Sequence, residues 1–180
     1  MLKRWVMGEA VRREWVPLEQ IAPSLPRAVI ASEDQLFCAH WGVDFDVLRE
    51  ILSDPEGPDR GGSTISMQTV KNVFLWHGRS YVRKAIEIPL ALSADLAWGK
   101  KRMIEIYLNV AEWGDGIFGA EAASQFYFQK SAAALTAAEA SRLAAALPNP
   151  ERRGSSRPTR ASQRVLRRMA GVEPYLGCLR

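Results

Sequence analysis

Apolar residues recur at helical spacing along most of the chain, in segments separated by short loops rich in Gly and Pro. In "DFDVLREIL" they share one face after Asp44, a residue type that commonly caps a helix N-terminus. The longest helical pattern begins at the expected N-cap Ser80, with a kink expected at Pro89. The pattern predicts helices over residues 23–34, 44–52, 63–75, 80–98, 100–108, 120–128, 135–147 and about 159–170.

Residues at the ends of these segments predict where several helices start and stop. Ser24 is the expected N-cap of the first helix, and Gly171 is the expected end of the last. Thr136, followed three residues later by Glu139, predicts a capping box. The segment "NVAEWGDGIFG", residues 109–119, indicates a Gly-rich loop. Because no alternating β runs and no repeats stand out, we expect a mainly α fold.

Length and composition are those of an ordinary globular domain with an uneven charge. At 180 residues the chain can bury a substantial core, and we expect residues 1–180 to form a single domain. Residues 151–180 hold eight Arg and two Glu, a net charge of +6, so residues 1–150 carry −2. A basic C-terminal segment suits phosphates, anionic lipid headgroups or nucleic acid.

Cysteines and hydropathy leave the cellular compartment open. Cys38 and Cys178 form neither a metal-binding spacing nor a disulfide framework, and they could pair only if the ends of the domain met. No run approaches the roughly 18 apolar residues that a membrane helix needs. The first 15 residues are too charged for a signal peptide. Either the protein is cytoplasmic or an upstream anchor is missing from this chain.

The segment "EDQLFCAHWGVD", residues 33–44, places two adjacent acids beside aromatic residues and a His. A helix that ends near Glu33 would put that carboxylate at the mouth of a cleft. A metal site needs several convergent ligands, and Asp34 with His40 offers two at no recognised spacing. In the alternative interpretation, Phe37 and Trp41 pack in the core, His40 forms a buried hydrogen bond and the acids are solvated.

The segment "RGGSTISMQTVKN", residues 60–72, combines a tight turn with a polar helix face. The helix, capped by Ser63 or Thr64, would offer free N–H groups at its N-terminus to an anion. Two amides and a lysine on one face suit sugar hydroxyls and a phosphate, although such a face is often simply solvated. The residues that share this face are Thr64, Gln68, Lys71 and Asn72.

The segment "RSYVRKAIEIPL", residues 79–90, gathers three cations around a second glutamate, Glu87. Arg83 and Glu87 form an i,i+4 pair, and the apolar continuation of the helix suggests that Glu87 is buried. Two separated glutamates, phosphate-binding cations and sugar-binding amides are the chemistry of glycosyl transfer with a phosphate leaving group. A carboxylate takes a proton from an acceptor hydroxyl while cations stabilise the departing pyrophosphate.

In order along the chain, these segments resemble the five motifs of the family 51 peptidoglycan glycosyltransferases. The matching segments are "ED-x-x-F-x-x-H-x-G-x-D" at 33–44, "GGSTI-x-x-Q-x-x-KN" at 61–72, "RK-x-x-E" at 83–87, "KKRMIEIYLN" at 100–109 and "GDGIFGAEAASQFYFQK" at 114–130. The resemblance covers residues from about 15 to 150. Because the chain leaves no room for a transpeptidase domain, it is similar to the monofunctional biosynthetic transglycosylases of Gram-negative bacteria.

The resemblance implies a lysozyme-like domain with a large helical lobe and a small membrane-proximal jaw lobe. The implied reaction polymerises lipid II, a disaccharide-pentapeptide on undecaprenyl pyrophosphate, into β-1,4-linked glycan strands and releases the lipid pyrophosphate. By position, Glu33 is implied to be the general base on the acceptor 4-hydroxyl, and Glu87 the donor-side glutamate. The implied substrate-binding residues are Ser63, Thr64, Gln68, Lys71, Asn72, Arg79, Arg83 and Lys84.

Other motif positions are implied to shape the site or depart from the family pattern. Met67 stands where the family normally has the first of two glutamines, and Pro89 closely follows the third motif. The residues implied to be mainly structural are Asp34, Phe37, His40, Glu105, Tyr107 and Asn109.

The resemblance also implies partners and a location. The expected partners are lipid II, the growing glycan strand, the bacterial inner membrane and cell-division proteins, but not nucleic acid. No cofactor is required and no dedicated metal site is expected, although Mg²⁺ or Mn²⁺ assists the pyrophosphate in some relatives. The family carries an N-terminal transmembrane anchor that this chain lacks. We therefore expect a truncated start and a domain on the periplasmic face of the membrane. Residues Trp5 to Met7 are either a membrane-surface segment or a frayed terminus.

Two alternative functions explain part of the sequence. A lysozyme-like hydrolase or lytic transglycosylase would also use one glutamate in a helical domain, but it does not need the cations around Arg83, because its substrate has no pyrophosphate. A nucleic-acid or membrane-surface binding module would use the basic C-terminal segment, with binding that falls steeply with salt. It leaves Glu33 and Glu87 without a role.

Overall fold

The computed structural model of the chain describes residues 12–53, 62–76, 78, 81–150 and 155–180. Most of these residues are helical, which confirms the expected mainly α class. The elements in chain order are β1 (Arg12–Arg13), η1 (Leu18–Gln20), α2 (Ser24–Glu33), α3 (Phe45–Ser53), α4 (Ile65–Phe74), α5 (Tyr81–Val110), β2 (Glu112–Gly114), β3 (Ile117–Phe118), α6 (Ala120–Phe128), η2 (Ala132–Ala134), α7 (Ala137–Ala146), α8 (Arg160–Val172), η3 (Glu173–Tyr175) and η4 (Gly177–Leu179). The expected cap Ser80, the residue Arg79 and the segment around Trp5 lie outside the described residues.

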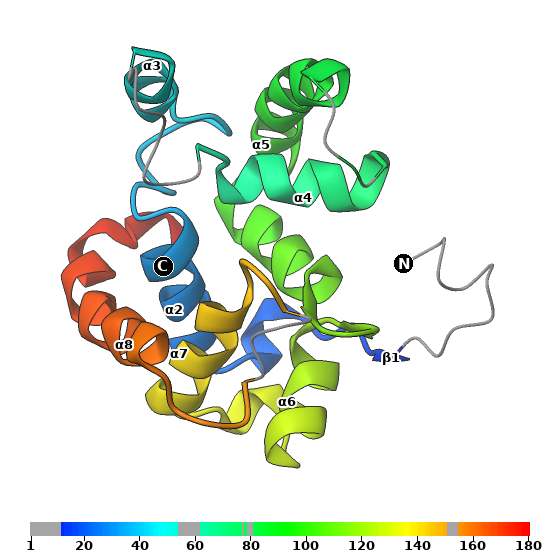
Figure 1. Cartoon of the computed structure of the whole chain (residues 1–180), viewed down its shortest axis with the longest axis vertical. Helices are drawn as coiled ribbons and strands as arrows, with labels where there is room; N and C mark the ends of the chain where they lie inside the picture. The colour runs from blue at the N-terminus through cyan, green and yellow to red at the C-terminus, as the bar shows by residue number, and fades with distance from the viewer. Residues whose placement is uncertain (1–11, 54–61, 77, 79–80, 151–154) are drawn as a thin grey trace.

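The helices form a larger body and a smaller one, joined by α5. In the larger body, α2 packs against α7 and α8, which also pack against each other. In the smaller body, α4 packs along α5. Figure 1 shows α3, α4 and the start of α5 at one end of the molecule, with α6 at the other. This arrangement agrees with the two lobes expected of a lysozyme-like glycosyltransferase domain.

Helix α5 is broken at Gly99. That residue has φ 67° and ψ 169°, a conformation that glycine adopts without the steric cost other residues incur. The break falls between the two helices predicted on either side of Gly99. Pro89 lies inside the helix, and the non-helical backbone is found at Gly99 rather than at the kink expected at Pro89. Among the described residues, no helix is long and apolar enough to span a membrane.

Three predicted helix starts are confirmed by side-chain hydrogen bonds. The Asp44 carboxylate accepts from the backbone N–H of Val47 at 3.0 Å. Thr64, rather than Ser63, caps α4, because its hydroxyl accepts from the N–H of Met67 at 3.1 Å. The capping box predicted between Thr136 and Glu139 is also present at the start of α7.

Two predicted helix boundaries are wrong. Ser24 is the first residue of α2, and its hydroxyl donates to the carbonyl of Leu135 at 3.0 Å instead of capping the helix. Gly171 does not end the last helix, which continues to Val172 and into η3. The difference at Ser24 arises from a contact with a residue 111 positions later in the chain, which the local sequence does not show.

The segment predicted as a Gly-rich loop contains part of a small sheet. Its strand order is β1-β3-β2, with β3 antiparallel to β2 and parallel to β1. Arg12 pairs with Ile117, so the described N-terminal strand is hydrogen bonded to a strand more than 100 residues later in the chain. These strands are two or three residues long, too short to show an alternating pattern in the sequence.

The C-terminal turns of the chain lie against the segment that follows α2. Helix α8 buries Val165, Met169 and Val172 against the core and leaves its arginines outside. Beyond it, Cys178 forms a disulfide with Cys38, with the two Cα atoms 5.5 Å apart. The two cysteines therefore pair although the N-terminal strand lies elsewhere, because Cys38 follows α2, and the bond joins the segment after Glu33 to the C-terminal turns.

The segment that carries the first motif lies directly on α5. Gly42 has φ 74°, and a Cβ at this position would come within 2.5 Å of the carbonyl oxygen of Ala91. Thr64 fixes the same glycine from the other side, because its hydroxyl donates to the Gly42 carbonyl at 2.5 Å. Only glycine allows the segment after Glu33 to approach α5 so closely.

Candidate active site

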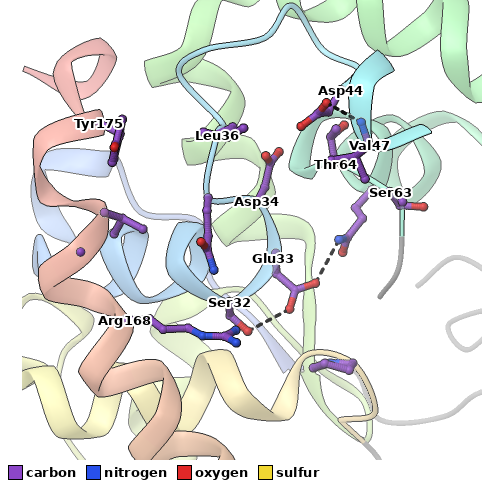
Figure 2. Close-up of a pocket in the computed structure, with 16 residues that line it drawn as sticks. Ser32, Glu33, Asp34, Leu36, Asp44, Val47, Ser63, Thr64, Arg168 and Tyr175 are labelled. Carbon is purple, nitrogen blue, oxygen red and sulfur yellow. Dashed lines mark hydrogen bonds between the residues drawn. The ribbon is translucent and has the colours of Figure 1, made fainter. Parts of the chain in front are cut away.

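A cavity of about 900 Å³ opens beside the C-terminal end of α2, a size suited to a ligand of several rings. Figure 2 shows Glu33 at its centre, as the last residue of α2. This position confirms the prediction that a helix ending near Glu33 presents the carboxylate to a cleft. The cavity is lined by Ser32, Glu33, Asp34, Gln35, Leu36, Asp44, Val47, Gly62, Ser63, Thr64, Gln68, Pro148, Arg168, Gly171, Val172 and Tyr175.

The Glu33 carboxylate is mostly buried and hydrogen bonded through both oxygens. Gln68 donates from Nε2 to Oε2 at 3.1 Å, and the Ser32 hydroxyl donates to Oε1 at 3.1 Å. Burial raises the pKa of Glu33, and the charge of Asp34 adds to the rise. The two hydrogen bonds and the charge of Lys71 lower the pKa but do not cancel this rise. A carboxylate with a raised pKa is a stronger base once ionised.

Asp34, the neighbouring acid, is buried and part of the framework. Its Oδ1 lies 2.9 Å from Nε2 of His40, and its Oδ2 accepts from the backbone N–H of Ile65 at 2.9 Å. The N-terminus of α4 therefore binds an internal carboxylate, and the expectation of free N–H groups for an external anion is wrong at Ile65. The bond ties the segment after Glu33 to the start of α4.

The alternative interpretation of the first motif holds only for some of its residues. Phe37 is fully buried, and His40 hydrogen bonds to Asp34 as expected. Trp41, in contrast, is 70% exposed, and Asp34 is buried rather than solvated. The motif therefore packs through Phe37 and places both acids at the cavity, where Asp34 also forms part of the framework.

Gln68 connects Glu33 to the buried part of α5. Its Oε1 accepts a hydrogen bond from the Tyr107 hydroxyl at 3.1 Å, while its Nε2 donates to Glu33. Burial raises the pKa of Tyr107 well above its ordinary value, so the phenol stays protonated and remains a donor. Tyr107, expected to be mainly structural, thus fixes which end of the Gln68 amide faces the base.

A cluster of cations lies on the smaller body beside this cavity. Glu87 is buried and forms ion pairs with Arg83 and, at 3.3 Å, with Lys84. Lys84 also donates to the Ser63 hydroxyl at 2.7 Å. Burial lowers the pKa of Lys71 and Lys84, and the charge of Arg83 lowers both further. These cations repel one another, so a bound polyanion would stabilise the cluster.

The structure thus divides the predicted site residues into two groups. Ser63, Thr64 and Gln68 line the cavity together with Glu33. The Thr64 hydroxyl is already engaged with Gly42 and Met67. Met67 itself is fully buried, so this position points into the core. The predicted residues that do not line the cavity are Lys71, Asn72, Arg83, Lys84 and Glu87, and Arg79 lies outside the described residues.

The sequence did not predict the wall that faces Glu33. This wall comes from the end of α7 and from α8, whose arginines were interpreted only as a general basic segment. A helical pattern shows which face of α8 is buried but not which cavity its edge borders. The wall residues are Pro148, Arg168, Gly171, Val172 and Tyr175.

Within the described residues, no three His, Cys, Asp or Glu side chains converge as metal ligands. The groups next to the cavity on the donor side are lysines and an arginine, which repel a metal ion. Among the described residues, the groups on the donor side of the cavity therefore do not form a metal-binding set.

Comparisons with known proteins agree with this geometry. The family described as Transglycosylase matches residues 2–172. A biosynthetic peptidoglycan transglycosylase of Brucella suis biovar 1 (strain 1330) is 52% identical over 186 residues, covering 100% of this chain and 83% of the relative. Proteins of the same name from Agrobacterium fabrum and Jannaschia sp. are 50% and 54% identical, over 99% and 89% of this chain and 82% and 66% of the relatives. The chain is therefore a glycosyltransferase that belongs to the transglycosylase family.

Proposed function

We propose that this enzyme is a peptidoglycan glycosyltransferase that polymerises lipid II into β-1,4 glycan strands and releases undecaprenyl pyrophosphate. The names of its relatives, biosynthetic peptidoglycan transglycosylases, support the peptidoglycan substrate. The observation that carries the proposal is the position of Glu33, a mostly buried carboxylate with a raised pKa in a large cavity next to a cluster of cations. A hydrolase of finished glycan would need the carboxylate but not the cations.

Glu33 acts as the general base in this proposal. In its ionised form it takes the proton from the 4-hydroxyl of the acceptor sugar as that oxygen attacks the anomeric carbon of the donor. The donor C–O bond to the pyrophosphate breaks, and the pyrophosphate leaves with the bonding electrons. Gln68 holds the carboxylate in one orientation. Its hydrogen bond also lowers the pKa of Glu33 and so limits the rise caused by burial.

The cations Lys71, Arg83 and Lys84 bind the donor pyrophosphate. A leaving group with two phosphates would offset the mutual repulsion that lowers the pKa of both lysines. Glu87 serves as a positioning residue on the donor side, because its carboxylate contacts Arg83 and Lys84. By the family resemblance, Arg79 joins these cations and Asn72 contributes to the same site.

Two features support a position at the periplasmic surface of the inner membrane. Large apolar side chains are exposed along the end of α4 and the first half of α5, as for contact with lipid. They include Phe74, Trp76, Val82 and Leu96, which are 51–76% exposed. The disulfide between Cys38 and Cys178 persists in oxidising compartments such as the bacterial periplasm. Interaction with cell-division proteins and assistance by Mg²⁺ or Mn²⁺ remain predictions from the family resemblance.

The test is polymerisation of labelled lipid II in detergent, with products separated on a gel. We expect a ladder of glycan strands from the native chain and none from Glu33→Gln, because an amide cannot accept the proton. The matched control Glu19→Gln, an exposed acid away from the cavity, should give the native ladder. Normal turnover by Glu33→Gln would remove the base assignment. Cleavage of finished peptidoglycan without any polymer would favour the hydrolase.

A further inference from the structure

The cavity has a second charged wall that the proposed mechanism does not use. Arg168 is the one cation among the described residues that line the cavity, and the other charged residues there are Glu33, Asp34 and Asp44. Figure 2 shows its side chain extending from α8 in the direction of Ser32. Within the described part of the chain, the Arg168 guanidinium forms no ion pair or hydrogen bond. Its binding capacity is therefore available to a ligand.

The position of Arg168 is fixed by its neighbours on α8. Met169 and Val172 are buried, so the helix is anchored through the face next to Arg168. Two links hold this wall against α2 and the segment after it. They are the Cys38–Cys178 disulfide and the ion pair of Arg27 with Glu173 at 2.6 Å. A guanidinium on an anchored helix loses less freedom on binding than one on a loop.

The chemistry of the wall selects the part of the substrate that can bind there. A guanidinium binds carboxylates and phosphates through paired hydrogen bonds. The pyrophosphate already has Lys71, Arg83 and Lys84, none of which lines this cavity. In a lipid-linked disaccharide-pentapeptide the remaining anionic groups are the carboxylates of the peptide. Glu33, Asp34 and Asp44 repel such a carboxylate from the rest of the cavity, which leaves the α8 side as the favourable place for it.

We propose that Arg168 binds a carboxylate of the stem peptide, with Tyr175 and Pro148 forming the adjoining contact surface. This inference rests on the proposed function and adds peptide recognition to it. The α8 wall is thus a specificity subsite for peptide-bearing sugar, separate from the cations that bind the leaving group.

The first test compares two lipid-linked substrates, one with free peptide carboxylates and one with these converted to amides. We expect the native enzyme to show a KM about three to ten times higher for the amidated substrate, with kcat within about twofold. Arg168→Gln should show this higher KM for both substrates. The matched control is Arg167→Gln, which removes the same charge from the preceding residue of α8, an exposed residue that does not line the cavity. This variant should keep the native difference in KM between the two substrates. Equal discrimination by Arg168→Gln and the native enzyme would overturn the proposal.

A second test does not depend on polymerisation. The soluble disaccharide-pentapeptide, without lipid or phosphate, is titrated into the protein while the arginine Nε–Hε signals are followed by NMR. We expect one signal to shift in the native protein and in Arg167→Gln, and this shift to be absent in Arg168→Gln and with the amidated ligand. If the native protein polymerises lipid II but shows no shift, the peptide subsite is overturned and the transferase stands. If the shift occurs without polymerisation, the subsite stands and the proposed function fails.

Discussion

Gln68 holds Glu33 by a hydrogen bond of 3.1 Å from Nε2 to Oε2, and the oxygen of the same amide accepts from Tyr107. An amide group can present either its oxygen or its nitrogen to a neighbour. Here the phenol of the fully buried Tyr107 donates to the amide oxygen, so the nitrogen faces Glu33. The orientation of the proposed base is thus set from the core of α5. One consequence is that Tyr107, which does not line the cavity, influences the protonation of the proposed base.

Replacing Tyr107 by Phe should change the pH dependence of activity. Without the phenol, the Gln68 amide can turn its oxygen toward Glu33, and the carboxylate loses a hydrogen bond that lowers its pKa. The acidic limb of kcat/KM against pH should then move to higher pH, with a loss of roughly two- to tenfold at neutral pH. Tyr127→Phe removes a phenol bonded to the Trp113 carbonyl and is the control. Superimposable profiles for Tyr107→Phe and the native enzyme would contradict this role.

Glu33→Gln should stabilise the fold while it abolishes activity. The pKa of Glu33 is raised by folding, so the native state favours the protonated form, and the ionised form present at neutral pH weakens folding. An amide avoids this cost, and we expect a gain on the order of 1 kcal/mol at pH 7. The gain should shrink as the pH falls through the raised pKa, because Glu33 is then protonated in the native enzyme as well. Urea unfolding at pH 7 and pH 4 measures the difference, and an equal or larger gain at pH 4 would refute the sign.

The disulfide between Cys38 and Cys178 should contribute strongly to stability. It closes a loop with a sequence separation of 140 residues, and constraint of the unfolded chain by such loops is worth about 2–5 kcal/mol. Replacing both cysteines by Ser should lower the free energy of unfolding by this amount. Dithiothreitol should bring the native chain close to the double variant and leave the variant unchanged. A native chain equally stable with and without dithiothreitol would show that the bond does not stabilise it.

Glu139 should make the free energy of unfolding depend on pH in the acidic range. Burial acts to raise the pKa of Glu139, but hydrogen bonds from Lys130 and Thr136 outweigh it and lower the pKa to about 2. The ionised carboxylate therefore stabilises the folded state when the pH is above the ordinary glutamate pKa of about 4.5. This stabilisation is lost as the pH falls toward 2. Glu139→Gln should cost about 1 kcal/mol at pH 7 and little near pH 2. Unfolding curves at both pH values provide the test, and a penalty independent of pH would exclude this cause.

Local features of the fold were predictable because the residues that determine them are close in sequence. The caps at Asp44, Thr64 and Thr136 each depend on a side chain and an N–H three residues away. Ser24 shows the limit of this reasoning, since its hydroxyl serves the carbonyl of Leu135, which no local pattern reveals. Arg12 and Ile117 likewise pair across the chain in strands too short for a periodic signal.

In the candidate site, too, features set by residues close in sequence were predictable, and features set by contacts between distant segments were not. Glu33, Gln68 and the cations near Glu87 could be predicted from motif resemblance and helical spacing. The place of Asp34 at the N-terminus of α4 could not, because it depends on how two helices meet. Arg168 and Tyr175 were missed for the same reason, since they reach the cavity through the packing of α8 against α2.

The spacing of the two cysteines also has a consequence for biosynthesis. Cys38 is synthesised long before Cys178, so the covalent link between them can form only after helices α3 to α8 have emerged from the ribosome. Until then the position of the segment that follows Glu33 depends on non-covalent contacts, such as the hydrogen bond from the Ile65 N–H to Asp34. The order of synthesis therefore postpones the covalent link between this segment and the C-terminal turns until helices α2 to α8 have all been made.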